Sequence, residues 1–170
     1  MKKYFSVILA CICTAFVFCA CESLNPDNNK GTVYGLWVVD SLNVEVSTTI
    51  NGNTTKHTSL TNFTTDYCRL YLEDNILLAT LWYNFDTDIE GFSYVETDSS
   101  RRITFKEGLN AGDNGKAIVL LGIYDVELIG DRMIFKQPEA SIGGTTYGAS
   151  ERATYYFHRA PKSEKPKDAE

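Results

Sequence analysis

The sequence predicts an all-β domain, an antiparallel up-and-down meander closed into a β-barrel of about eight or nine strands. Its dominant hydrophobic period is two, in segments rich in Val, Ile, Thr, Tyr and Phe, and no stretch has helical periodicity. Short turn-forming sequences separate these segments, which favours sequential antiparallel hairpins. Because an open meander leaves two unpaired edges, closure into a barrel is the expected solution.

The expected strands follow one another with tight turns between them. Asn51-Gly52 is typical of a two-residue hairpin, and Glu73-Asp74-Asn75, Asp98-Ser99-Ser100 and Gly130-Asp131 are further turn sequences. Two longer Gly-rich links, near 107–115 and 138–150, are expected to be mobile. We expect strands near 33–49, 54–61, 67–73, 76–85, 91–97, 101–106, 116–129, 132–137 and 151–159.

One segment defines the expected interior most clearly. Its alternate residues are apolar, which commits that face to the core: Leu77, Ala79, Leu81, Tyr83 and Phe85. Small residues at Ala79 and Gly122 would leave room inside the barrel if both pointed inward. The outer face of the same segment, with Trp82, and the run 118–123 are apolar as well, so they need cover from a loop or a partner.

The N-terminus has the pattern of an export signal that ends at a cysteine. Two lysines precede an apolar core from Tyr4 to Phe18, and Ala20 stands just before Cys21. This resembles a bacterial lipoprotein signal, in which the chain is cut before the cysteine and the thiol is acylated. We therefore expect a lipid at Cys21 and a place in the cell envelope, on the outer membrane, facing the periplasm or the surface. A plain secretory signal cut near Ala20 is the alternative.

These features divide the chain into a signal peptide (1–20), a lipidated tether (21–32), a barrel domain (33–160) and a disordered tail (161–170). Cleavage lowers the basic residues from 16 to 14 against 22 acidic ones, so the formal net charge changes from −6 to −8. An acidic chain argues against nucleic acid as a partner, and membrane attachment would rest on the lipid. Cys68 is the remaining thiol, on an apolar strand face, where we expect it to be buried and inert.

Gly35-Leu36-Trp37, at the head of the first strand, resembles the Gly-x-Trp signature that opens the lipocalins and the lipocalin-like lipoproteins of Gram-negative envelopes. The resemblance covers about residues 33–160 and implies a lipocalin-like barrel. It also implies that Trp37 plugs one end and that Arg159, at the end of the last strand, lies over it. The helix that usually follows a lipocalin barrel is missing from the Pro- and Lys-containing tail.

No motif for catalysis, a metal or a cofactor emerges. The segment Asp86-Thr87-Asp88-Ile89-Glu90-Gly91 matches the opening of a calcium loop, but position twelve holds Thr97 where a bidentate Glu is needed. We interpret it as an acidic hairpin turn. His57 and His158 have no second ligand at metal spacing. An enzyme is therefore not expected, and neither is a cofactor.

Two functions of different classes remain open. In the first, the barrel is a membrane-anchored module that binds a small apolar or amphipathic ligand in a cup lined by Leu81, Tyr83, Phe85, Phe105, Tyr124 and Phe135. In the second, the barrel is filled and its outer face or loops bind a protein or a glycan, as an accessory or inhibitor would. The protein partner is unknown. A connected void inside the barrel would favour the first hypothesis, and a packed interior the second.

Overall fold

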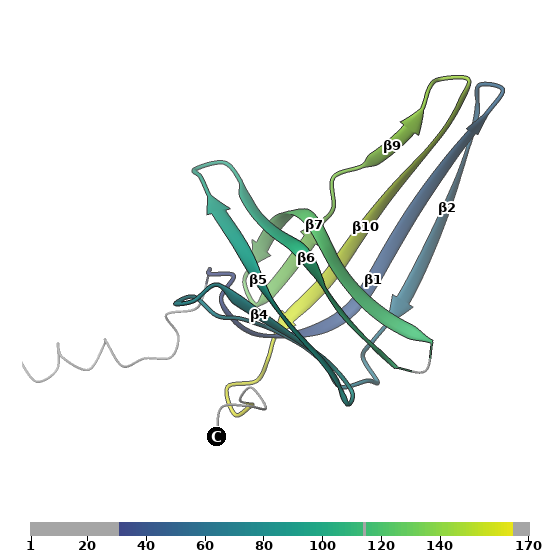
Figure 1. The fold of residues 1–170 in the computed structure, drawn as a ribbon. Coiled ribbons are helices and arrows are strands. Elements are labelled where there is room, and N and C mark those ends of the chain that lie inside the picture. Colours follow the sequence, from purple (N-terminus) through teal and green to yellow (C-terminus); the bar gives the residue numbers. More distant parts are fainter. Residues whose placement is uncertain (1–30, 114, 165–170) are drawn as a thin grey trace, which may run out of the picture. The chain divides into compact units, whose positions relative to one another are not determined.

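A computed structural model describes residues 31–113 and 115–164, which form ten β-strands in one antiparallel sheet (Figure 1). The N-terminal segment with Cys21 lies outside the described residues. Within them, no helix has the length and apolar character needed to cross a membrane. The strands are β1 (Gly35–Ile50), β2 (Asn53–Asn62), β3 (Cys68–Leu72), β4 (Leu78–Tyr83), β5 (Asp86–Glu96), β6 (Arg101–Asp113), β7 (Lys116–Ile129), β8 (Arg132–Lys136), β9 (Ala140–Gly143) and β10 (Tyr147–Arg159).

Eight of the strands close a barrel, which confirms the expected fold class. The ring runs β1-β3-β4-β5-β6-β7-β8-β10 and is completed by pairing of β10 with β1. It departs from a strictly sequential meander, because β2 and β9 lie outside the ring. The first part of β1, Gly35–Val38, pairs with β3, whereas Ser41–Ile50 pairs with β2, and a register shift between Val39 and Ser41 separates the two parts.

Outside the ring, four strand segments form an extension that we call the arm. It consists of β2, β9 and the adjoining parts of β1 (41–50) and β10 (147–151), in the order β2-β1-β10-β9. Figure 1 shows these strands running together away from β4, β5 and β6. The β1–β2 turn is the predicted Asn51-Gly52, and both residues have positive φ, 52° and 78°, as a type I′ turn requires.

The barrel interior is a single apolar cluster. Its largest fully buried side chains include Trp37, Phe63, Tyr83, Phe105, Tyr124, Phe135 and Phe157. A second, smaller cluster lies outside the wall and joins Leu36, Val38, Trp82 and Ala160. The expected cover for the outer face of β4 is thus the chain's own C-terminal segment. Arg69 on β3 also binds Glu164, with Nε to Oε1 at 2.6 Å, so residues 161–164 differ from the disordered tail that we expected.

Several predicted boundaries were wrong for local backbone reasons. Strand β4 begins only at Leu78, because Leu77 has a φ of 51°, and it ends at Tyr83, because Asn84 and Phe85 form the turn to β5. The expected acidic turn at residues 86–90 is therefore the start of β5. Both Gly-rich links also contain strand: β6 continues through a register shift between Phe105 and Leu109, and residues 138–150 contain β9.

Candidate functional site

Five of the six predicted cup residues face the barrel interior. Leu81, Tyr83, Phe105, Tyr124 and Phe135 are fully or almost fully buried. The sixth placement is wrong, because Phe85 is 99 % exposed at the β4–β5 turn. Strict alternation would have put Phe85 on the same face as Leu81 and Tyr83, but alternation ends where Asn84 takes a positive φ of 54°.

The buried aromatic rings contact one another across the interior. Phe105 lies 6.2 Å from Tyr124 and 6.3 Å from Phe135, and Phe135 lies 4.8 Å from Phe157, measured between ring centroids. Gly122 has a φ of 87° and is half-buried, and a Cβ built there would meet no heavy atom within 4 Å, so open space lies beside this residue. These contacting rings fill the part of the interior between β6, β7, β8 and β10.

Trp37 and Arg159 adopt the arrangement that the sequence resemblance implied. They are paired across β1 and β10, and the Arg159 guanidinium lies 3.7 Å from the Trp37 ring centroid. Arg159 donates to the carbonyls of Tyr34 at 2.6 Å and Thr32 at 2.8 Å, while Trp37 Nε1 donates to Val33 at 2.7 Å. Gly35 has a φ of 107°, which favours glycine there. We call this the Trp37 end.

A polar cluster lies at the opposite end of the barrel. Asp66 Oδ2 accepts hydrogen bonds from Tyr83 at 3.1 Å and from Lys116 at 3.0 Å. The bond from Lys116 is the main cause that lowers the pKa of Asp66. Burial, followed by the bond to Asp66, raises the pKa of Tyr83 to about 12. A neutral tyrosine and an ionised aspartate therefore link the β2–β3 loop to β4 and β7 at neutral pH.

The acidic run beside Phe85 supports the sheet. Asp86 Oδ2 accepts from the Gly112 amide at 2.9 Å, and Asp88 Oδ2 accepts from the Asn110 amide at 2.7 Å. These carboxylates bind β6 backbone groups where the β5–β6 ladder, which runs over Phe92–Glu96, has ended. Among the described residues, no group of three or more His, Cys, Asp or Glu could hold a metal ion.

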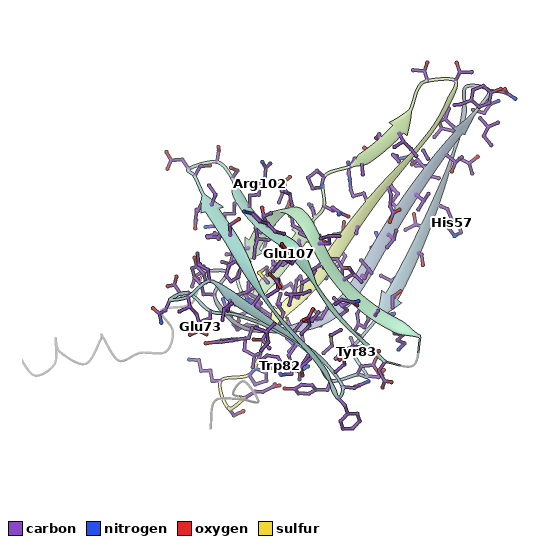
Figure 2. All side chains as sticks on the ribbon, in the orientation of Figure 1. His57, Glu73, Trp82, Tyr83, Arg102 and Glu107 are labelled. Atoms are coloured by element: carbon purple, nitrogen blue, oxygen red, sulfur yellow. The ribbon has the colours of Figure 1, made fainter. Side chains whose placement is uncertain are left out.

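The remaining predicted residues lie apart from one another. His57 is exposed on β2, and His158 Nδ1 lies 2.7 Å from Asp40 Oδ1. Figure 2 shows His57 on the arm, well away from Trp82 and Tyr83 in the barrel. Cys68 is fully buried, as expected, and burial raises the pKa of its thiol. A buried, protonated thiol is a poor nucleophile.

Two hollows lie at the periphery of the described residues. One, of about 660 Å³, lies at the Trp37 end between the β5–β6 hairpin and residues 126–129 of β7. Tyr94 and Arg101 both donate to Glu96 beside it, at 2.8 and 2.7 Å. The other, of about 420 Å³, lies on the arm and is lined mainly by Ser, Thr and Gly with Lys56 and Glu139.

The arm has two edges that differ in how well they are protected. The β9 edge is four residues long and lies between Pro138 and Gly143-Gly144. The β2 edge is ten residues long, pairs with β1 without a register shift, and is exposed at every position except Thr61. Long, regular, exposed edges favour addition of another strand. Sequence analysis missed this feature, although the Thr-rich run after Asn51-Gly52 was visible.

No family model, no curated protein and no solved structure matches the chain.

Proposed function

We propose that the chain is a non-catalytic binding module of the bacterial envelope, anchored to the outer membrane through a lipid on Cys21. Its barrel is filled, and its arm binds another protein by accepting an extended segment as an added strand. The observation that supports this function best is the β2 edge, a ten-residue strand whose described neighbour lies on one side only. Strand addition gains affinity from main-chain hydrogen bonds and specificity from alternate side chains.

The packed interior favours this function over the ligand cup. Fully buried aromatic rings in mutual contact would have to move before a small molecule could enter. The β2 edge needs no such rearrangement, since the side chains of β2 already lie in solvent at every position except Thr61. On β2 itself, Leu60 is the one large apolar side chain, so main-chain hydrogen bonds would carry much of the affinity.

The hairpin geometry identifies which backbone groups would receive the partner. In a two-residue hairpin the residues flanking the turn form a hydrogen-bonded pair, here Ile50 and Asn53. By alternation, Thr54, Lys56, Thr58 and Leu60 direct their N–H and C=O groups to the free edge. Lys56 is the one charged side chain on β2 and lies 3.3 Å from Glu45, so an acidic residue in the partner would compete with Glu45.

The test is to place a photo-crosslinking amino acid at Leu60 of the full chain in the envelope of its host. The crosslinked protein is identified by mass spectrometry and purified, and its affinity for the full chain is measured. Thr58→Pro removes one outward N–H and should weaken binding at least about tenfold. Thr58→Val keeps that N–H and should change affinity less than about twofold. Equal affinity of both variants would contradict strand addition.

The competing cup hypothesis has its own test. Detergent-solubilised full chain is titrated with fatty acids, bile-salt-like amphipaths and a solvatochromic dye while Trp and Tyr emission is followed. We expect no saturable binding. Saturable binding that Ala79→Phe abolishes without loss of stability would favour the cup instead. Intact mass tests the anchor, and a mature chain that begins elsewhere without acyl mass would exclude it.

A further inference from the structure

The Trp37 end carries exposed aliphatic side chains that neither the core nor the proposed strand addition uses. They are Ile76, Leu77, Val95 and Ile129, with exposed fractions of 60, 38, 61 and 62 %. Ile76 and Leu77 lie in the β3–β4 connection, while Val95 and Ile129 lie at the ends of β5 and β7, next to the β5–β6 and β7–β8 connections. Isolated exposed aliphatics are ordinary, but their repetition on successive connections at one end of a barrel is a pattern that needs a physical explanation.

The strand register places all three connections at this end. Gly35 pairs with Leu72 next to the β3–β4 connection, and Trp37 pairs with Arg159, whose neighbour His158 pairs with Arg132 at the start of β8. The β5–β6 hairpin and the end of β7 line one hollow there. In Figure 2, Glu73, next to the β3–β4 connection, lies on the left of the barrel and Tyr83 lies toward the right.

Two of the aliphatic residues lie directly across from an arginine. Val95 pairs with Arg102, and Ile129 pairs with Arg132. Arg102 is ion-paired with Asp125 at 2.9 Å, so Ile129 beside Arg132 is the pair that suits the boundary of a phospholipid layer, where acyl chains and phosphate groups meet within a few ångströms. Leu77, in the left-handed region at φ 51°, directs the β3–β4 connection away from the core, a backbone state that bulky residues rarely adopt.

The chain also attaches to its N-terminal segment at this end. Arg159 binds the carbonyls of Thr32 and Tyr34, which fixes the start of the domain beside Trp37. Nine residues lie between Cys21 and Gly31, so the chain between them spans at most about 35 Å. A lipid on Cys21 would hold the Trp37 end close to the bilayer. Tethering raises the effective concentration so far that a weak contact suffices.

We propose that the Trp37 end rests on the phospholipid surface, with Ile76, Leu77, Val95 and Ile129 in the interfacial layer. This inference depends on the lipid anchor of the proposed function. It also gives the arm an orientation: β1 runs from Trp37 to Ile50, so the arm tip lies up to roughly 40 Å from the contact at about 3.3 Å per residue. The β2 edge would then face away from the anchoring membrane.

The test uses the full lipidated chain in vesicles of phosphatidylethanolamine and phosphatidylglycerol. Ile76→Cys, Val95→Cys and Ile129→Cys each receive an environment-sensitive fluorophore, while Cys68 stays unlabelled because it is buried. Ile50→Cys, Leu60→Cys and Phe85→Cys are matched controls at comparably or more exposed sites elsewhere. We expect a blue shift and at least threefold stronger quenching by spin-labelled lipid at the first three sites.

Flotation separates the two proposals. A chain that fails to float with the vesicles lacks its anchor, which overturns the anchored function and the contact together. A chain that floats but is quenched equally at all six sites overturns the contact alone. As a further check, Ile76→Ser combined with Ile129→Ser should leave flotation unchanged and lower the quenching at Val95→Cys severalfold. Undiminished quenching at that site would contradict a shared contact.

Discussion

The barrel and the arm are built from the same two strands, and they differ in what covers those strands. Within the barrel, β1 and β10 bury Trp37, Val39 and Phe157 against the opposite wall. In the arm, β1 continues as alternating Val with Ser, Thr and Glu, it lies between β2 and β10, and the outermost strands β2 and β9 are exposed. Pairing of β1 with β10 runs through both regions, with one register shift between Val39 and Ser41. Backbone pairing alone can therefore extend a sheet, whereas the stability of the sheet depends on burial of one face.

The same contrast appears on the outer wall. The outer face of β4 is apolar and is covered by Ala160 and the residues beside it. The outer face of β7 is also apolar, but Val119, Leu121 and Ile123 remain about half exposed. The sequence patterns of β4 and β7 are similar. Whether the outer face of each strand is buried therefore depends on which other segment of the chain packs against it.

The largest expected effect on stability comes from removing the Trp37 side chain. Trp37→Ala should destabilise the protein by about 3–5 kcal/mol, because a large buried side chain is removed and Arg159 loses the ring beneath it. Phe85→Ala is the matched control, since it removes an aromatic ring that lies in solvent, and it should change stability by less than about 0.5 kcal/mol. Denaturant midpoints measure both. Equal midpoints for the two variants would remove the distinction between barrel and periphery.

Asp88→Ala should have a smaller effect, about 1 kcal/mol, because it leaves the Asn110 amide without its acceptor. Glu90→Ala, two residues along the same strand, is the control and should be nearly neutral. The measurement is again the denaturant midpoint, with amide exchange at Asn110 as a local readout. If exchange of the Asn110 amide is unchanged in Asp88→Ala, the Asp88 carboxylate does not protect that amide in place of a β5–β6 backbone hydrogen bond.

The polar cluster of Asp66, Tyr83 and Lys116, at the end of the barrel opposite the Trp37 end, should make the stability of the protein depend on pH. Because the folded pKa of Asp66 lies below its ordinary value of about 4, its stabilising contribution is complete above that value and is lost as pH falls through the lowered folded pKa. Asp66→Asn should therefore lower the unfolding midpoint at pH 7 and differ little from the parent near pH 2.

The matched control for this pH effect is Asp113→Asn, whose carboxylate accepts from the Asn84 side-chain amide at 3.4 Å and which faces Lys116 across the β6–β7 ladder, whereas Lys116 is ion-paired with Asp66. Its stability difference from the parent should change less between the two pH values. A difference in unfolding midpoint between Asp66→Asn and the parent that stays constant with pH would mean that the ion pair with Lys116 contributes nothing measurable to stability.

The smallest effect on global stability is expected in the arm. Gly52→Ala strains a turn at φ 78°, so amides of the adjoining β1–β2 ladder should exchange severalfold faster while the unfolding midpoint stays almost constant. Gly91→Ala, at a position with open space and ordinary φ, should leave arm exchange unchanged. A parallel fall in the midpoint of Gly52→Ala would show that arm and barrel unfold as one unit.

The fold class and the plug followed from local sequence signals. Period-two alternation predicts strands wherever one face is covered, and Gly35, Trp37 and Arg159 were recognisable as a motif from their positions at the first and last strands. Phe85 and Leu77 were misplaced because alternation was extended through Asn84 and to residue 77, where positive φ interrupts it. A single-residue backbone state changes facing for every residue beyond it.

The sequence by itself determined the all-β class, the Asn51-Gly52 hairpin, most of the interior residues and the buried position of Cys68, because these depend on neighbours within a few residues. The tertiary structure alone decided that β1 pairs with β3 below its register shift and with β2 above it, which creates the arm. It also decided that aromatic rings from β6, β7, β8 and β10 meet across the interior. Such contacts join residues far apart in the chain, and their distances depend on barrel closure, which no local pattern encodes.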